Sequence, residues 1–359
     1  MMIKIVGAGM SGLVAGITLV KNGKKATAYE QHKEIGMGCG HNIMAIRNYD
    51  LNYDQMEEFT KRGLNLKFAK PINKIIKYAP SGKTMEVFSE DGPIFYAIMR
   101  GHDKTSFDVQ LAEQFEKEGG NLQLGEKKTL KAGDIVATRN IFKNFWCIGT
   151  EYVDVDVDPN TIMFFMDNRY CPKGYIYLIP YGKHEISIAA TTYDLNCPLP
   201  ILFNRFLEEN KVISKITEKS TKINNFGCEA YSNVPKTAKV NGRLFVGSAA
   251  GFLDSARGFG IKYALYSGIL AGKSINENID YDKLWKNEFE KELLEAFSRR
   301  LALEKMTNRD YEKLILKDKL PIRKYDKLPE SMKIFIKKLE INKQLEMWRK
   351  KYDLKKIFS

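Results

Sequence analysis

The chain is poor in the residues that bind metal ions or form disulfides. Among its 359 residues there are five cysteines and four histidines. The number of cysteines is odd, no two have the C-x-x-C spacing, and the histidines show no ligand-like spacing. We therefore expect neither a disulfide framework nor a metal site. Free cysteines are typical of a reducing compartment, so we expect a cytoplasmic protein.

Long apolar runs, internal repeats and low-complexity segments are also lacking. No stretch approaches the roughly 18 consecutive apolar residues that a membrane-spanning helix needs, although 44% of the residues are hydrophobic. The first expected strand starts at Ile3, which leads us to expect no signal peptide. The length suits one large α/β domain or two closely connected ones. These features predict a soluble globular protein.

Positive charge is concentrated at the C-terminal end. The net charge is +13, and residues 323–359 carry twelve Lys and Arg against five Asp and Glu. Apolar residues at helical spacing accompany this charge: Met332, Phe335, Ile336, Leu339, Leu345, Trp348 and Tyr352. A basic amphipathic helix of this kind either packs its apolar stripe on the core or lies on anionic lipid headgroups, at the periphery of a membrane. We expect no nucleic-acid partner, because no recognised motif accompanies the charge.

The first thirty residues predict a dinucleotide site. A short apolar strand precedes Gly7, Gly9 and Gly12, which form the G-x-G-x-x-G pattern, and Glu30 ends the next expected strand. The first glycine permits a tight turn, the second lets the backbone approach a pyrophosphate, and the third lets the helix pack closely on the strand. Glu30 is placed to bind an adenosine ribose, and the alternative is a surface acid. A unit of this kind at the N-terminus favours FAD over NAD.

Five further motifs follow in a fixed order. They are EIGMGCG at 34–40, FDVQLA at 107–112, VDVDVDP at 153–159, PKGYIYLIP at 172–180 and the glycine-rich stretch at 247–268. With the N-terminal unit, they resemble the geranylgeranyl reductase family of FAD proteins, which includes the archaeal digeranylgeranylglycerophospholipid reductases. The resemblance covers roughly residues 1–275.

The resemblance implies the p-hydroxybenzoate hydroxylase-like fold. This is an α/β fold in which a Rossmann-type FAD-binding domain is interleaved with a smaller β-sheet substrate domain, followed here by C-terminal helices. We expect the FAD-binding domain at residues 1–60, 100–150 and 235–280, and the substrate domain at 61–99 and 151–234. Residues 281–359 then form a helical region.

The resemblance also implies the residues of the site. Cys39 and Gly40 match a Cys-Gly pair beside the flavin ring, and Cys39 is one candidate proton donor, with water and the flavin as the others. Ser248, Gly251, Gly260 and Ile261 lie in the stretch that contacts the ribityl chain and the isoalloxazine end. Tyr175, Tyr177 and Pro180 match a strand that lines the substrate cavity. Two tyrosines on one strand face are also typical of an ordinary core.

Three departures from the family pattern concern cofactor binding. Ser248 replaces the aspartate that binds the ribityl chain, so we expect weaker binding of FAD rather than its loss. The family's arginine position is taken by Lys104, with Arg100 four residues upstream, and we favour Arg100 as the cofactor contact. Thr138 and Arg139 replace the Asp-Gly of a second flavin motif, which disfavours a hydroxylase that uses NADPH directly.

The resemblance implies an FAD-dependent oxidoreductase that reduces C=C bonds in the prenyl chains of lipids. Its electrons would come from a ferredoxin-like protein or from NAD(P)H. One alternative is a flavin-dependent monooxygenase or halogenase, because YIYLIP is similar to a halogenase motif. The other is a non-catalytic protein that keeps the fold.

Overall fold

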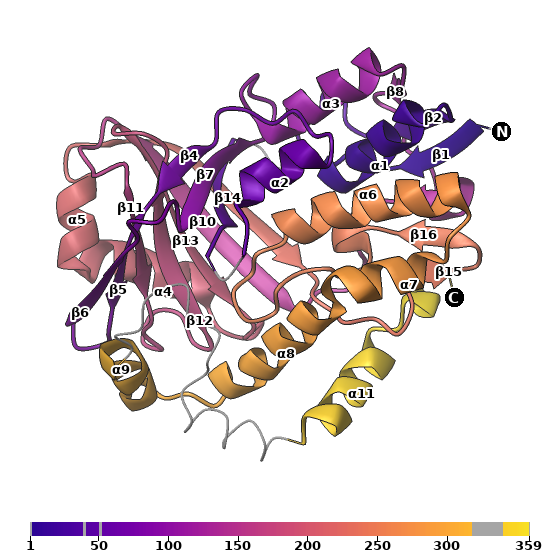
Figure 1. Ribbon diagram of the computed structural model, residues 1–359. Coiled ribbons are helices and arrows are strands. Elements are labelled where there is room, and N and C mark those ends of the chain that lie inside the picture. Colours follow the sequence, from indigo (N-terminus) through magenta and orange to yellow (C-terminus); the bar gives the residue numbers. More distant parts are fainter. Residues whose placement is uncertain (1, 39–40, 50–51, 318–339, 359) are drawn as a thin grey trace.

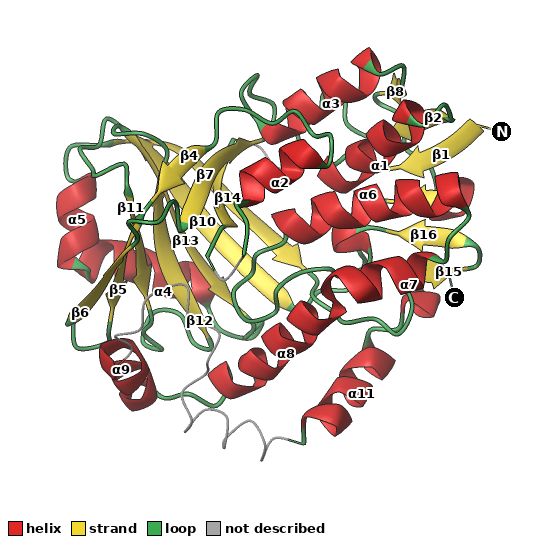
Figure 2. Cartoon of the chain, viewed as in Figure 1, coloured by secondary structure: helices red, strands yellow, loops and turns green. Residues whose placement is uncertain are grey.

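The computed structural model describes residues 2–38, 41–49, 52–317 and 340–358. A six-stranded sheet with helices packed on it lies beside a larger seven-stranded sheet, and a third, three-stranded sheet lies between helix α2 (Gln55–Lys61) and the larger sheet (Figures 1 and 2). In the described part of the chain, no helix combines the length and apolar character needed to cross a membrane.

The six-stranded sheet is the Rossmann-type part. Its strand order is β15 (Lys239–Val240), β16 (Arg243–Phe245), β9 (Ile135–Val136), β1 (Met2–Val6), β2 (Lys25–Tyr29) and β8 (Asn121–Gln123). All neighbours are parallel except β15 and β16. Parallel strands place their carboxyl ends at one edge of the sheet, where α/β proteins bind ligands.

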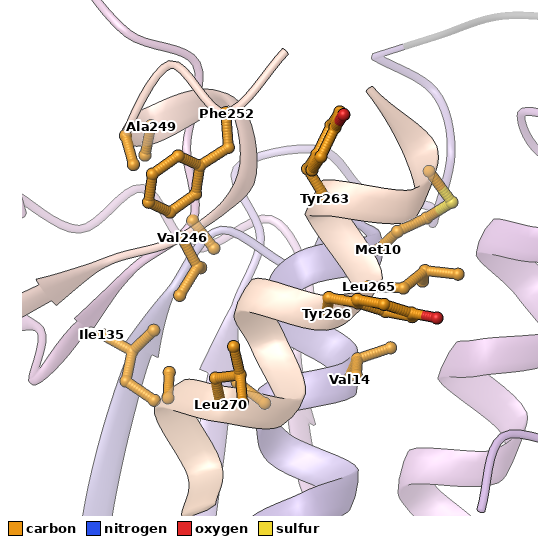
Figure 3. Packing of buried hydrophobic residues seen from close by; sticks show 14 of the residues in the cluster. Met10, Val14, Ile135, Val246, Ala249, Phe252, Tyr263, Leu265, Tyr266 and Leu270 are labelled. Carbon is orange, nitrogen blue, oxygen red and sulfur yellow. The ribbon is translucent and has the colours of Figure 1, made fainter. Parts of the chain in front are cut away.

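The helices that pack with this sheet in one core include α1 (Met10–Lys21), α3 (Phe107–Lys117) and α6 (Ile261–Glu277). Figure 3 shows Leu265 and Leu270 of α6 in the same cluster as Val14 of α1 and Ile135 of β9. Small residues bring α1 and α6 together. A Cβ at Gly268 would meet the Ser11 carbonyl oxygen at 2.4 Å, and a Cβ at Gly272 would meet the Cβ of Thr18 at 2.6 Å. Glycine is therefore required at both positions of α6.

The seven-stranded sheet contains the strand with the predicted aromatic residues. Its order is β14 (Thr221–Ala230), β10 (Phe145–Val153), β13 (Glu185–Thr192), β12 (Gly174–Pro180), β11 (Thr161–Phe165), β5 (Lys74–Tyr78) and β6 (Thr84–Phe88). Helix α4 (Leu199–Glu209) covers one face, and α5 (Lys211–Thr217) follows it. Ile176 and Leu178 of β12 pack on Phe203 and Phe206 of α4. Side chains alternate along a strand, so Tyr175 and Tyr177 point to the opposite face.

The three-stranded sheet has the order β3 (Asn42–Arg47), β7 (Phe95–Arg100) and β4 (Lys70–Ile72). Ile43, Ile72 and Phe95 share a buried cluster with Ile162 and Ile179 of the larger sheet. This cluster joins the three-stranded sheet to the seven-stranded sheet. The expected boundary at residue 150 falls inside β10, and the division into three domains stays a prediction.

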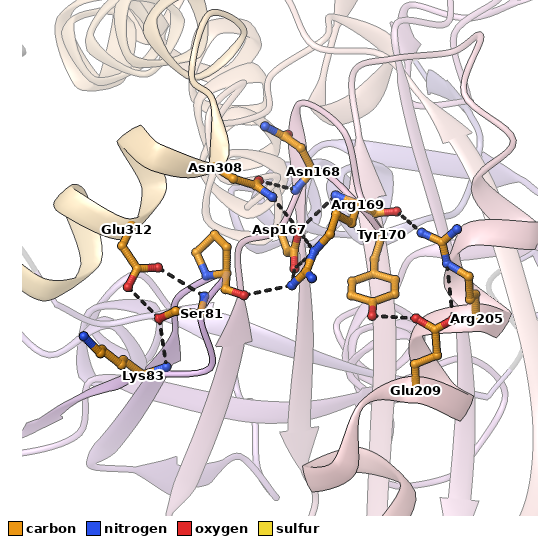
Figure 4. A network of polar contacts seen from close by, with 11 residues as sticks. Ser81, Lys83, Asp167, Asn168, Arg169, Tyr170, Arg205, Glu209, Asn308 and Glu312 are labelled. Atoms are coloured by element: carbon orange, nitrogen blue, oxygen red, sulfur yellow. Dashed lines mark hydrogen bonds and ion pairs between the residues drawn. The ribbon is translucent and has the colours of Figure 1, made fainter.

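The C-terminal region is helical, as expected, in its described part. It comprises α7 (Tyr281–Trp285), a π-helical turn (Lys286–Glu290), α8 (Lys291–Leu303), α9 (Asn308–Lys317) and α11 (Ile341–Lys351), followed by a 3-10 turn (Leu354–Ile357). Short 3-10 turns also occur at Leu130–Ala132 and Gly247–Ala249. Figure 4 shows α9 bound to the larger sheet: Asn308 Nδ2 donates to Asp167 Oδ1 at 2.9 Å, and Ser81 Oγ donates to Glu312 Oε1 at 2.5 Å.

The apolar stripe of the basic tail packs on the core where it is described. Leu345 and Tyr352 are buried, and the Trp348 ring lies 5.4 Å from the Phe297 ring of α8. Met332, Phe335, Ile336 and Leu339 lie outside the described residues. For the described half of the stripe, packing on the core is therefore the correct interpretation.

Candidate cofactor and substrate site

A cavity of about 1040 Å³ lies between the six-stranded and the seven-stranded sheet and is lined by residues of both parts. The Gly7–Gly9 turn and Glu30 line it on the side of the six-stranded sheet, and Tyr175 and Tyr177 line it on the side of the seven-stranded sheet. The cavity thus lies at the carboxyl ends of β1, β2 and β9. This is the position expected for a ligand site in this fold class.

The three N-terminal glycines fit the predicted roles. Gly7 has φ +100°, and a Cβ there would meet the Ala137 carbonyl oxygen at 2.7 Å. A Cβ at Gly12 would meet the Gly7 carbonyl oxygen at 2.1 Å, so Gly12 permits the close contact of helix and turn. A Cβ at Gly9 would meet no protein atom within 4 Å. The missing side chain of Gly9 therefore leaves space in the cavity rather than relieving a clash.

Two helices begin at this cavity without a side-chain cap. Gly9 is the N-cap of α1 and Gly260 is the N-cap of α6, and neither helix has a side-chain hydrogen bond to its first turn. Gly9, Gly260 and Ile261 all line the cavity. Uncapped N–H groups and the helix dipole favour negatively charged or electron-rich groups. This pair of helix ends fits the diphosphate and the polar ring edge of a flavin dinucleotide.

Glu30 lies at the cavity directly after β2. Its carboxylate accepts hydrogen bonds from the backbone N–H of Ala8 at 3.2 Å and of His32 at 3.1 Å. These bonds fix the carboxylate beside the glycine turn. A carboxylate held there suits the predicted contact to an adenosine ribose.

Arg100 reaches the cavity from the end of β7, and Lys104 does not line it. The guanidinium donates to both carboxylate oxygens of Asp108, from Nε at 2.6 Å and from Nη2 at 2.9 Å. Asp108 is almost fully buried and also accepts from the Gly101 N–H at 3.1 Å. This geometry supports the choice of Arg100 over the exposed Lys104.

The residues of the glycine-rich stretch have different roles. Ser248 is exposed to the cavity, and Gly260 and Ile261 lie at its wall. Gly251 is not among the lining residues. It has φ +80°, and a Cβ there would lie 2.5 Å from the Tyr231 ring, so this glycine is required for backbone conformation and packing. The structure thus does not support the predicted cofactor contact of Gly251.

Thr138 and Arg139 occupy the end of β9, beside Gly7, where the family has Asp-Gly. The Arg139 guanidinium donates to the Gly38 carbonyl oxygen. The substitution therefore adds a positive charge to the cavity. No meander precedes this segment: only β8 and a 3-10 turn lie between α3 and β9.

An aromatic wall forms the other side of the cavity. The Tyr175 ring lies 5.9 Å from the Tyr177 ring and 5.8 Å from the Phe164 ring of β11. The Tyr175 hydroxyl donates to the Arg257 carbonyl oxygen, and burial raises the pKa of both tyrosines well above the usual value. Ile162 and Ile179 complete an apolar lining. Pro180 is buried and does not line the cavity, so the predicted substrate contact of Pro180 is not supported.

Cys39 and Gly40 lie outside the described residues, and their predicted roles stay predictions. Two other cysteines, for which no role was predicted, belong to the cavity wall. Cys147 on β10 and Cys228 on β14 both line the cavity. Their contact depends on the pairing of strands far apart in the sequence, and no local motif marks it.

The comparisons with known proteins agree with this geometry. A family model described as an NAD(P)-binding Rossmann-like domain matches residues 5–54. The digeranylgeranylglycerophospholipid reductase of Methanocaldococcus jannaschii is 23% identical, with 86% of this chain and 88% of that protein covered.

Two solved structures share the fold. A geranylgeranyl bacteriochlorophyll reductase-like protein from Thermoplasma acidophilum has a TM-score of 0.73 at 20% identity, covering 97% of this chain and all of the other. The flavin-dependent brominase Bmp2 has a TM-score of 0.65 at 13% identity, covering 95% of this chain and 99% of the other. The predicted fold class and the predicted resemblance are confirmed. In sequence and in fold, this chain is similar to the geranylgeranyl reductase family of FAD-dependent oxidoreductases.

Proposed function

We propose that the protein is an FAD-dependent reductase of C=C bonds in the prenyl chains of lipids. The observation that carries the proposal is the continuity of one cavity of about 1040 Å³. Two uncapped helix N-termini border the cavity, and an apolar aromatic wall forms the side on the seven-stranded sheet. Such a cavity suits a charged dinucleotide next to a long apolar substrate.

The polar end of the cavity would hold FAD. The turn of Gly7 and Gly9 with the start of α1 would bind the diphosphate, and Glu30 would bind the ribose. Arg100, Ser248 and the start of α6 are placed along the remaining length of the cavity. Bound FAD in its reduced form supplies the hydride for the reduction of an isolated C=C bond.

The aromatic wall would bind the prenyl chain and exclude water. Tyr175, Tyr177 and Phe164 offer ring faces, and Ile162 and Ile179 offer branched apolar side chains. Each buried CH₂ group of a substrate contributes about 0.8 kcal/mol. The candidate proton donors are still Cys39, water and the flavin.

The source of electrons and the membrane contact complete the proposal. Thr138 and Arg139 stand where the family has Asp-Gly, a motif that helps to bind NADPH. We therefore propose either a ferredoxin-like protein or NAD(P)H as the electron donor. Lys343, Lys350 and Lys351 on α11 are exposed, while Leu345 and Trp348 of the same helix pack on the core. We propose that this basic face contacts anionic headgroups when the enzyme takes its lipid substrate.

The experiment begins with the absorption spectrum of the purified protein and identification of the released chromophore. The protein is then reduced anaerobically and incubated with a phospholipid that carries unsaturated geranylgeranyl chains. Mass spectrometry is expected to show the gain of two hydrogens for each reduced double bond. A colourless protein that takes up no added FAD contradicts the proposal, and so does a reduced holoprotein that leaves the lipid unchanged.

Two observations favour the halogenase or monooxygenase alternative: the similarity of YIYLIP to a halogenase motif and the fold shared with the brominase. The same reduced protein can be mixed with oxygen and followed by its absorption. A long-lived oxygen adduct with transfer of oxygen or halide to a substrate would favour this alternative. Rapid oxidation without product, together with reduction of the lipid, favours the reductase.

Replacing Ser248 by aspartate is expected to tighten FAD binding. Ser248 is exposed to the cavity, and a carboxylate there accepts a stronger hydrogen bond from a ribityl hydroxyl than a serine can. A charge-assisted bond contributes about 1.5–3 kcal/mol, which corresponds to roughly 10- to 100-fold in Kd. Titration of apoprotein with FAD measures the effect, with Ser248→Asn as the uncharged control. Equal affinities of the aspartate and asparagine variants would contradict the predicted contact.

A further inference from the structure

Two free cysteines lie opposite each other in the cavity wall. Cys147 of β10 and Cys228 of β14 are direct partners in the antiparallel register of these strands. Directly opposed residues of antiparallel strands have Cα atoms about 4.5–5.5 Å apart. This spacing lies within the range of about 4.4–6.8 Å in which a disulfide forms without movement of the backbone.

The pair faces the cavity and not the bulk of the core. Both residues line the cavity together with Tyr177, whose hydroxyl oxygen lies 4.0 Å from Cys147 Sγ. Cys147 is buried, whereas Cys228 is half-buried on the edge strand of the sheet. Cys228 is therefore the more accessible thiol, and Cys147 is the more deeply buried one. This is the arrangement of an attacking and a resolving cysteine.

The two thiols also differ in pKa. The hydrogen bond between them raises the pKa of Cys147 and lowers the pKa of Cys228, and the positive charge of Arg139 lowers the pKa of Cys228 further. Burial adds to the increase for Cys147 and opposes the decrease for Cys228, whose pKa is still lowered overall. Because the thiolate is the nucleophile in disulfide exchange, Cys228 is the thiol that reacts first.

We propose that Cys147 and Cys228 form a redox-active dithiol–disulfide couple, a two-electron site in the wall of the cofactor cavity. The Cys228 thiolate attacks a small disulfide that enters the cavity, forms a mixed disulfide and releases one thiolate. The Cys147 thiol then loses its proton and displaces the second thiolate, which leaves the Cys147–Cys228 disulfide. The pair gives up two electrons and two protons, and the small disulfide becomes two thiols. A dithiol reverses both steps.

The remaining described cysteines provide an internal contrast. Cys171 is fully buried, and its Sγ donates to the carbonyl oxygens of Tyr175 and Thr191. Burial raises the pKa of Cys171 and of Cys197. Neither lines the cavity, so neither is expected to react.

The test uses the full-length protein with its bound flavin, equilibrated without oxygen in buffers of oxidised and reduced glutathione. The mixture is quenched with acid, and the free thiols are alkylated after unfolding. Trypsin places each of the five cysteines in a separate peptide, with Cys147 in residues 144–169 and Cys228 in residues 223–236. Mass spectrometry then identifies which peptides are joined, whether or not the enzyme is active.

The expected result is a reversible link between these two peptides under oxidising conditions, with the loss of two alkylated thiols. Cys147→Ser is expected to carry glutathione on Cys228, whereas Cys228→Ser leaves Cys147 alkylated, and Cys197→Ser behaves as the unchanged protein. Alkylation of both Cys147 and Cys228 at every glutathione ratio would overturn the proposal. A link from either cysteine to the peptide of Cys39 (residues 34–47) would overturn it equally. The wild-type peptide map decides the matter even if one variant does not fold.

Discussion

Replacing Gly9 by threonine is expected to abolish FAD binding and to leave the fold intact. Gly9 has φ −75° as the N-cap of α1, a conformation open to any residue, and a Cβ there meets no protein atom within 4 Å. Threonine and glycine are about equally favourable at an N-cap, so helix stability changes little. The side chain instead fills the space through which the diphosphate approaches the backbone. We expect at least a 100-fold increase in Kd, about 2.7 kcal/mol or more.

Two measurements check this result together. Titration with FAD gives the affinity, and thermal unfolding of the apoprotein gives the stability. Gly227→Ala is the control, because a Cβ on this edge-strand glycine makes only ordinary contacts, at 3.4 Å or more, and lies outside the cavity lining. A Gly9→Thr protein that binds FAD like the control would show that no diphosphate passes this turn. Gly12→Ala, whose Cβ would meet backbone at 2.1 Å, is expected to fail in folding instead.

Replacing Asp108 by alanine is expected to lower the free energy of unfolding by about 3–5 kcal/mol. The Asp108 side chain is 3% exposed and accepts both hydrogen bonds from the Arg100 guanidinium, whose side chain is 12% exposed. Its loss also removes the acceptor for the Gly101 N–H. A charge that is desolvated without its partner accounts for most of the cost. Chemical denaturation followed by circular dichroism measures the change.

The control for this prediction is an exposed acid in a comparable ion pair. Glu57, 70% exposed and paired with Lys61 one helical turn away, is expected to change stability by less than about 0.5 kcal/mol on replacement by alanine. The double variant Arg100→Met/Asp108→Leu removes both charges and is expected to recover most of the loss. A single Asp108→Ala variant as stable as the Glu57 control would show that Arg100 is already well solvated.

The local part of the site could be predicted from the sequence. The order of strand, glycines, helix and acid predicted a turn of Gly7, Gly9 and Gly12 with Glu30 beside it. The structure has this arrangement, because its geometry depends on neighbours within about thirty residues, while the cofactor contacts of these residues stay predictions. The alternation of side chains along a strand likewise placed Tyr175 and Tyr177 on one face. The same alternation explains why Pro180 does not line the cavity: it is an odd number of residues from both tyrosines and so faces the other side.

The remainder depends on contacts that no local pattern encodes. Gly251 has the signature of a glycine that approaches a ligand, but it approaches the Tyr231 ring. A glycine required for a positive φ or a close contact looks the same in the sequence, whether it approaches a ligand or a side chain of the protein. Cys147 and Cys228 are brought together only by the register of β10 and β14.

The close contact of α1 and α6 has a consequence for the residence time of a bound dinucleotide. Gly268 and Gly272 hold the two helices against each other, so the two uncapped N-termini that face the cavity belong to one rigid unit. A ligand that binds both helix N-termini therefore cannot be released by a hinge motion between α1 and α6. We expect it to dissociate slowly, at a rate set by local unfolding of this helix pair.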